Sequence, residues 1–181
     1  MKGTTKGYIL GAVAAISYGT NPLFAVPLYE MGLTVVSVLF YRYVLATLIL
    51  GLVMLKRGDS FRLAPRQIPL MFIQGILFAL SSVGLFEAYN YMDVGLASTM
   101  LFVEPVIIAL ILWIFYRQRI SLATFIAILI SIAGVVCLAN PGPGAHVTGI
   151  GVVLVVLSAL SYSIYMVLIN KTSLRSLAGP T

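Results

Sequence analysis

Six apolar runs of about twenty residues dominate this sequence, and short polar segments separate them. A helix needs roughly 20 mostly apolar residues to cross the hydrocarbon core of a bilayer. Because lipid offers no hydrogen-bond partners, the backbone of each run must bond within its own segment, which favours helix. The pattern therefore predicts an all-α membrane protein with six transmembrane helices. The runs are Tyr8–Leu28, Val35–Leu55, Ile68–Tyr89, Leu96–Tyr116, Leu122–Leu138 and Gly149–Ile169.

Composition excludes a water-soluble domain. Apolar residues make up 61% of the chain and charged residues 9%, whereas soluble domains carry about 25% charged residues. The net charge of +6 could suggest nucleic-acid binding, but the Lys and Arg residues do not form one aromatic-laced basic face. We therefore expect a lipid bilayer and a small-molecule substrate as partners, and no nucleic acid.

The basic residues are distributed unevenly over the loops. Ten of the eleven Lys and Arg residues precede the first run or follow the second, fourth and sixth runs. Because Lys and Arg collect on the cytoplasmic side of membrane proteins, both termini of this multi-pass protein are predicted to lie on the cytoplasmic side of the inner (plasma) membrane. The exception is Arg42, within the second run. A cleaved signal peptide at Met1–Ser17 is disfavoured, because the apolar run continues to Leu28.

The sixth run repeats features of the first at an offset of 144 residues. Ala15-Ile-Ser-Tyr18 corresponds to Ala159-Leu-Ser-Tyr162. Small residues at every fourth position let helix backbones approach closely in membranes, and both runs carry such a stripe. Chance similarity between two apolar helices is the alternative. The stripe Gly7, Gly11, Ala15 and Gly19 maps onto Gly151, Val155, Ala159 and Ser163.

The spacing of the two copies determines their relative orientation. The second copy starts five runs after the first, and an odd number of crossings inverts it. Inverted repeats are typical of secondary transporters, whose substrate sites lie between the repeats. We expect residues 1–139 to form a first five-helix repeat and residues 140–181 an external turn and the first helix of a second, inverted and truncated repeat. The missing second repeat, or another copy of the chain, is then an expected partner.

Several short motifs occur in a characteristic order. They are Ser17-Tyr-Gly-Thr-Asn-Pro22 in the first run, Arg42 followed by an aromatic residue and Ala46 in the second, Ala88–Ser98 before and within the fourth, Pro105 in the fourth and Gly134 in the fifth. This arrangement resembles the amino-terminal part of EamA-type transporters of the drug/metabolite transporter superfamily. The resemblance implies ten helices in two inverted five-helix repeats. It also implies secondary transport, usually export, of small metabolites or amino-acid-like solutes.

Residues for catalysis or metal binding are scarce. The chain has one His, His146, and one Cys, Cys137. A Ser–His pair inside the membrane, a disulfide framework and a thiolate metal site are therefore not expected. We predict no enzyme activity, no catalytic residues, no metal and no cofactor. Glu87 and Glu104 could form an aspartic-protease-like dyad, which leaves an intramembrane enzyme as one alternative; a non-transporting membrane scaffold or assembly subunit is the other.

Polar residues inside the apolar runs form the candidate site. Ionisable side chains in the membrane are costly and mark functional positions. Arg42 and Glu104 each lie about seven or eight residues from the outer end of their runs, roughly 10–12 Å deep at 1.5 Å per residue. Opposite charges at one depth in a low dielectric attract strongly. The predicted substrate-binding residues are Asn21, Arg42, Ser81, Glu104, Tyr18 and Tyr162.

Purely structural roles are the alternative for these residues. Arg42 and Glu104 could form a structural ion pair, or Arg42 could reach toward the outer surface. The tyrosines could serve packing alone. Asn21-Pro22 could be a plain helix kink. Pro105 lacks a backbone donor beside Glu104, which would free a carbonyl to line a wet cavity.

Overall fold

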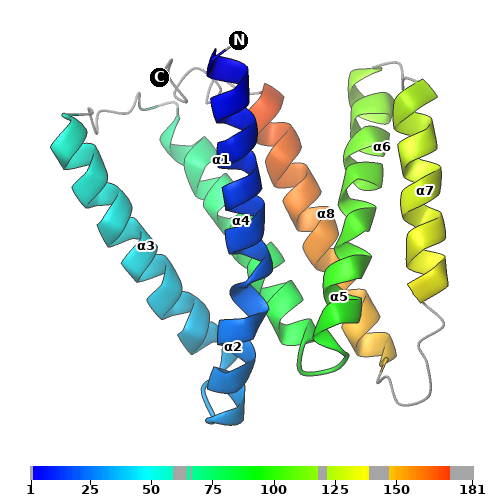
Figure 1. The fold of residues 1–181 in the computed structure, drawn as a ribbon, viewed down its shortest axis with the longest axis horizontal. Helices are drawn as coiled ribbons and strands as arrows, with labels where there is room; N and C mark the ends of the chain where they lie inside the picture. Colours follow the sequence, from blue (N-terminus) through cyan, green and yellow to red (C-terminus); the bar gives the residue numbers. More distant parts are fainter. Residues whose placement is uncertain (1, 59–64, 66, 118–121, 139–146, 172–181) are drawn as a thin grey trace. The chain divides into compact units, whose positions relative to one another are not determined.

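The computed structural model describes residues 2–58, 65, 67–117, 122–138 and 147–171. Two compact units make up the chain, Met1–Thr47 and Leu48–Thr181, and each is described by itself. Every regular element in the described residues is a helix (Figure 1). The all-α prediction is therefore confirmed for this part of the chain.

The first unit contains helix α1 (Lys2–Gly19), helix α2 (Asn21–Glu30) and the first half of helix α3 (Val35–Arg57). The first apolar run is thus two helices, broken at Thr20. Pro22 has no backbone N–H and its ring crowds the preceding turn, so the helix cannot continue unchanged. The Thr20 hydroxyl compensates by donating a 2.9 Å hydrogen bond to the Ser17 carbonyl.

A glycine turn joins α2 to α3. Gly32 has φ +86°, a left-handed conformation that suits glycine. The Leu33 N–H donates to the Leu28 carbonyl at 3.1 Å, and the Gly32 N–H donates to the Tyr29 carbonyl at 2.9 Å. This double closure is the Schellman pattern, which satisfies the last carbonyls of a helix. The Thr34 hydroxyl then accepts the Ser37 N–H at 3.3 Å and so caps the start of α3.

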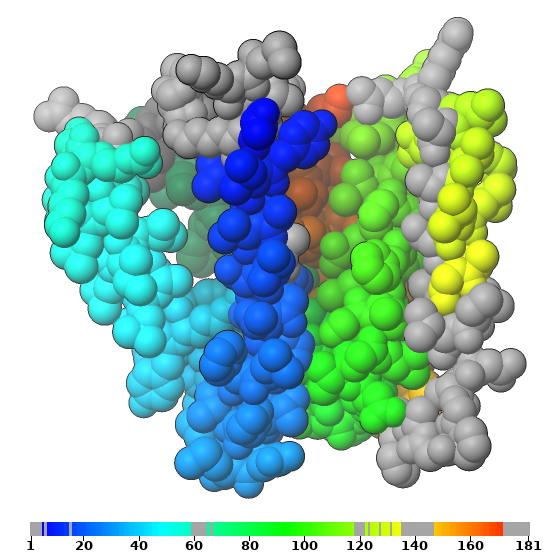
Figure 2. Space-filling model, viewed as in Figure 1, coloured from blue at the N-terminus to red at the C-terminus, as the bar shows by residue number. Residues whose placement is uncertain are grey.

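The second unit has helix α8 (Gly149–Lys171) at its centre. Helix α4 (Ile68–Ala88) and helix α6 (Glu104–Tyr116) both pack against α8. Helix α5 (Val94–Met100) and the short 3₁₀ helix η1 (Leu101–Val103) lead into α6, and helix α7 (Leu122–Leu138) packs beside them. The space-filling view shows α5, α6 and α7 on one face of this unit (Figure 2).

The fourth apolar run is interrupted where Pro105 enters the helix. Pro105 cannot donate to the Leu101 carbonyl, and the Glu104 N–H takes that carbonyl instead, which produces the tighter 3₁₀ turn. The Leu101 carbonyl therefore already has a backbone partner. The expectation that Pro105 frees a carbonyl for a cavity is not met at this position.

In the part of the chain that the structure describes, five helical segments are long and apolar enough to cross a membrane: Gly7–Glu30, Val35–Arg57, Ile68–Ala88, Val94–Tyr116 and Gly149–Lys171. The predicted fifth run coincides with α7, but this helix has 17 residues. At 1.5 Å per residue that is about 25 Å, shorter than a hydrocarbon core of about 30 Å. The described residues therefore contain five helical segments of full spanning length, and the sixth predicted span is matched by a shorter helix.

The core of the second unit lies where the start of α8 meets the end of α4. Ala88, Met92, Ala97 and Val155 form one buried cluster. A Cβ atom added at Gly151 would come within 3.0 Å of the Met92 sulfur, so glycine permits this contact. The Thr148 hydroxyl donates to the Tyr91 carbonyl at 2.8 Å. The turn after α4 and the residues entering α8 are thus joined.

Candidate functional site

The contact between α4 and α8 is built from small residues at its middle. We call this contact the α4–α8 seam. A Cβ atom added at Gly84 would lie 3.1 Å from the Leu154 carbonyl oxygen and 3.3 Å from the Ser158 Cβ. Glycine at position 84 therefore lets the two backbones approach closely, as small residues do between membrane helices. On α8, the stripe predicted from the repeat is buried at all four positions: Gly151, Val155, Ala159 and Ser163.

Two serines form a hydrogen-bonded pair inside this seam. The Ser158 hydroxyl donates to the Ser81 carbonyl at 2.6 Å, and the two hydroxyl oxygens lie 3.2 Å apart. Ser158 is 1% exposed and Ser81 is buried with it. Ser81, predicted to line a vestibule, therefore has a protein partner on α8. Its hydrogen bonds with Ser158 connect α4 to α8.

Glu104 lies where α6 begins, beside α8. The side chain is half-buried, and the Ser163 hydroxyl donates to the Glu104 carbonyl at 3.3 Å. Tyr162 precedes Ser163 in α8. The structure thus places two of the predicted site residues, Glu104 and Tyr162, on neighbouring parts of α6 and α8.

Three aromatic rings extend the site along the seam. Phe78 of α4 lies 5.3 Å from Tyr165 and 6.4 Å from Tyr162, measured between ring centroids. The two tyrosine rings are 5.6 Å apart, and all three pairs are tilted by 41° to 46°. These are tilted packing geometries that aromatic side chains favour. We call Phe78, Tyr162 and Tyr165 the ring trio.

Gln74 is a buried polar residue that the sequence reasoning missed. Its side chain is 7% exposed, and its Nε2 atom has no hydrogen-bond partner among the described residues. Phe78 was missed as well. Gln74, Phe78 and Ser81 follow one another at helical spacings of four and three residues, so they share one face of α4. The sequence feature that could have identified Gln74 is an amide in an apolar run, two helical turns before Ser81 on the same face of the helix.

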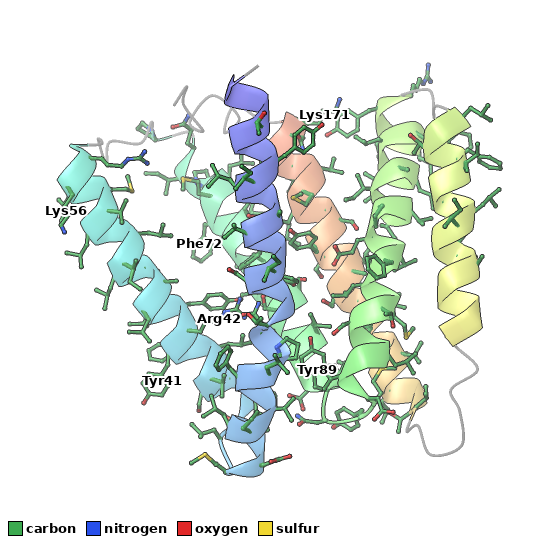
Figure 3. The ribbon with its side chains drawn as sticks, viewed as in Figure 1. Tyr41, Arg42, Lys56, Phe72, Tyr89 and Lys171 are labelled. Atoms are coloured by element: carbon green, nitrogen blue, oxygen red, sulfur yellow. The ribbon has the colours of Figure 1, made fainter. Side chains whose placement is uncertain are left out.

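The remaining predicted residues belong to the first unit. Tyr18 is 55% exposed near the end of α1, and Asn21 is half-buried where α2 begins. Arg42 is half-buried on α3, and its side chain points to a different side of that helix from the exposed Tyr41 (Figure 3). Each unit is described separately, so the pairing of Arg42 with Glu104 stays a prediction.

The site offers hydrogen bonding, aromatic surfaces and one carboxyl group. No group of three or more His, Cys, Asp or Glu residues that could hold a metal occurs in the part of the chain that the structure describes. Hydroxyls, rings, an amide and a carboxyl are suited to binding a small solute reversibly. Such a set supplies recognition, as expected of polar residues at an intramembrane functional site.

Comparison with known proteins connects this site to a family. The sequence matches the EamA-like transporter family over residues 5–140. The chain belongs to the EamA-like transporter family. This family is part of the drug/metabolite transporter superfamily and consists of transporters, so the EamA chain is an integral membrane protein. The matched residues run from α1 through α7, and α8 lies beyond them.

A curated relative supports the same assignment. It is named "Uncharacterized transporter YvbV", from Bacillus subtilis (strain 168), and is 29% identical to the EamA chain over 178 residues. The alignment covers 94% of the EamA chain and 56% of the relative, so the chain spans about half the length of the relative it matches. No solved structure matches the chain.

Proposed function

We propose that the EamA chain forms part of a secondary transporter that moves small metabolites or amino-acid-like solutes across the inner membrane, in the outward direction. The observation that carries this proposal is the polar seam inside an apolar helical unit of an EamA family member. Glu104 and Ser163 are joined by a hydrogen bond where α6 packs against α8, and Tyr162 is the residue before Ser163. Intramembrane polar groups of this kind mark substrate pathways.

The proposed site combines both units. Asn21, Arg42 and Tyr18 would face a vestibule shared with Ser81, Glu104 and Tyr162. Arg42 would bind a substrate carboxylate, because its planar guanidinium can donate two parallel hydrogen bonds to the two carboxylate oxygens. Between substrates Arg42 would pair with Glu104, because an unpaired charge in this medium is costly.

The proposed topology places both termini in the cytoplasm. The Lys and Arg bias over the loops supports this orientation. Within the second unit, the Lys171 Nζ lies 5.0 Å from the centre of the Tyr116 ring, so the ends of α8 and α6 are adjacent (Figure 3). At the opposite end, Thr148 bonds to Tyr91. Thr148 and Tyr91 belong to two connections that contain no Lys or Arg, and their contact supports a place for both residues on the outer side.

Transport would require a second repeat. Alternating access moves one repeat against the other around a fixed site. The partner repeat would be additional polypeptide, as in the longer relative, or another copy of the EamA chain in the opposite orientation. We treat α8 as the first helix of that second repeat, packed on the first repeat through the α4–α8 seam.

Flux measurements in proteoliposomes test the proposal. The chain should be reconstituted alone in one orientation, and also together with a second five-helix repeat, and loaded with a panel of radiolabelled amino acids for counterflow. We expect saturable counterflow only in the second preparation. Counterflow by the chain alone in a single orientation would contradict the two-repeat proposal. A folded two-repeat preparation with no flux for any solute in the panel would contradict transport of amino-acid-like solutes.

Charge exchange in the two-repeat preparation tests the site. Arg42→Glu and Glu104→Arg should each abolish counterflow. The double variant should regain stability, because the opposite charges are restored, but it should not regain transport. Recovery of both properties would show a purely structural ion pair. Intact folding and transport in both Arg42→Ala and Glu104→Ala would show that neither residue belongs to the site.

A further inference from the structure

The α4–α8 seam changes character along its length. Ser81 and Ser158 form a compact hydrogen-bonded pair. One turn toward the start of α4, the ring trio of Phe78, Tyr162 and Tyr165 replaces the small residues. Gln74 follows one further turn away on the same face of α4. Because α4 and α8 are antiparallel here, Gln74 lies toward the Tyr165 end of the trio.

Gln74 is an unusual residue for a seam of this kind. It is nine-tenths buried, yet its Nε2 donor bonds to no atom among the described residues. A buried donor without a partner costs the full desolvation of that group, and this cost is greatest in apolar surroundings. A leucine or methionine would fill the same volume without the cost. The amide is therefore suited to a partner that comes from outside the protein.

We propose that Gln74 and the ring trio form a subsite for the uncharged, planar, carbonyl-bearing part of the transported solute. The Gln74 Nε2–H would donate to the carbonyl oxygen of the solute, and the rings would contact its flat faces. Aromatic side chains provide large apolar surfaces for such contacts. The inference rests on the proposed transport function and names the chemical class of solute that the site accepts.

The Glu104 carboxyl group beside the ring trio favours a neutral ligand group over a negatively charged one. The Glu104 carbonyl accepts a 3.3 Å hydrogen bond from Ser163, which directly follows Tyr162 of the ring trio, so Glu104 lies close to the trio. A ligand carboxylate beside the trio would have to lose its water and approach a second carboxyl group. An amide or lactam carbonyl avoids both costs. An amide ligand also matches Gln74 fully, because the glutamine side chain can donate and accept at the same time.

Binding to the chain in lipid nanodiscs tests the subsite without any need for transport. Saturation-transfer NMR suits weak binding, and the probes are benzamide, acetamide and benzoate. We expect saturable binding of benzamide, which has both a ring and a neutral carbonyl. Acetamide lacks the ring and benzoate carries the charge, so each should bind at least about tenfold more weakly. Equal binding of benzoate and benzamide, or no saturable benzamide binding, would overturn the proposal.

A Gln74→Leu variant separates a ligand role from a structural one. The variant should lose benzamide binding by about tenfold, the worth of a typical neutral hydrogen bond. Its melting temperature should stay the same or rise, because a buried donor without a protein partner is removed. Ile73→Leu, on the exposed neighbouring position, is the matched control and should leave both properties unchanged.

The stability and the benzamide binding of the Gln74→Leu chain each test the subsite. A Gln74→Leu chain that melts at a lower temperature or fails to fold would show that Gln74 has a structural partner, and would overturn the subsite. Unchanged benzamide binding in this variant would do the same. Failure of the subsite together with amino-acid counterflow in the two-repeat preparation would leave the proposed transport function standing. Benzamide binding without any counterflow would support the subsite while removing the transport proposal.

Discussion

Helices α1 and α8 carry stripes of mostly small residues at every fourth position, but the two stripes differ in burial. On α8, Gly151, Val155 and Ser163 are all buried. On α1, a Cβ atom added at Gly7 or Gly11 would meet no atom of the first unit within 4 Å. The same pattern in sequence is therefore packed in one unit and open in the other.

The difference shows that a small-residue stripe permits close packing but does not create it. The helix opposite must also be narrow at the same level, and α4 meets that condition with Ser81 and Gly84. In the proposed two-repeat transporter, the third helix of the second repeat would pack on the stripe of α1, as α4 packs on α8.

The largest expected effect concerns the orientation of the two helices. If the repeat is inverted, α1 and α8 start on opposite sides of the membrane. In a Cys137→Ala background, Val147→Cys should be labelled in intact cells by an impermeant maleimide, whereas Thr5→Cys should be labelled only after permeabilisation. Labelling of both residues from outside would remove the inverted repeat and its topology.

Replacing a glycine by valine should lower the stability of the protein in the α4–α8 seam but not on α1. Gly84→Val would place methyl groups against the Leu154 carbonyl and the Ser158 Cβ, and overpacking of this kind costs about 1–3 kcal/mol. Gly11→Val, which meets no neighbour in its unit, should change stability by no more than about 0.5 kcal/mol. Thermal unfolding in one detergent measures both variants. Equal losses in the two would show that the seam is not tightly packed.

The smallest expected effect comes from the hydroxyl pair. Ser158→Ala should cost about 0.6–1 kcal/mol, because hydrogen bonds between membrane helices are individually modest. Ser17→Ala, on α1, removes the hydroxyl of an exposed serine and should be neutral. A double-mutant cycle with Ser81→Ala isolates the contact between the two hydroxyls, because the Ser81 carbonyl stays in place in that variant. Additive losses in that cycle would mean that the two hydroxyls do not interact.

Much of the fold follows from the apolar runs. The predicted run Leu122–Leu138 has the same bounds as α7, and the third run ends one residue from the end of α4. Periodicity and length suffice there because each helix satisfies its own backbone in lipid. The interruptions at Thr20 and at η1 are local effects of Pro22 and Pro105. Both prolines are evident in the sequence, but the apolar pattern alone does not show that each one divides its run.

The site was less predictable because depth along a helix does not fix direction around it. Depth places Ser81 at the right level for a vestibule, yet its partner Ser158 can only be identified once α8 is known to face α4. Gln74 and Phe78 were missed for the same reason. A single amide in an apolar run becomes informative only when its burial and its open donor are known.

The central claim is that α8 packs face to face against α4, with Ser158 opposite Ser81. A Ser81→Cys, Ser158→Cys pair in the Cys137→Ala background tests it directly in native membranes. The hydroxyl oxygens are 3.2 Å apart, so the two thiols should form a disulfide on mild oxidation and resist alkylation by a mass-tagged maleimide. In the control pair Ser82→Cys, Ser158→Cys, the first cysteine is rotated by one residue around α4. This pair should form no disulfide, and both thiols should be alkylated. Equal cross-linking of both pairs, or of neither, would contradict the account.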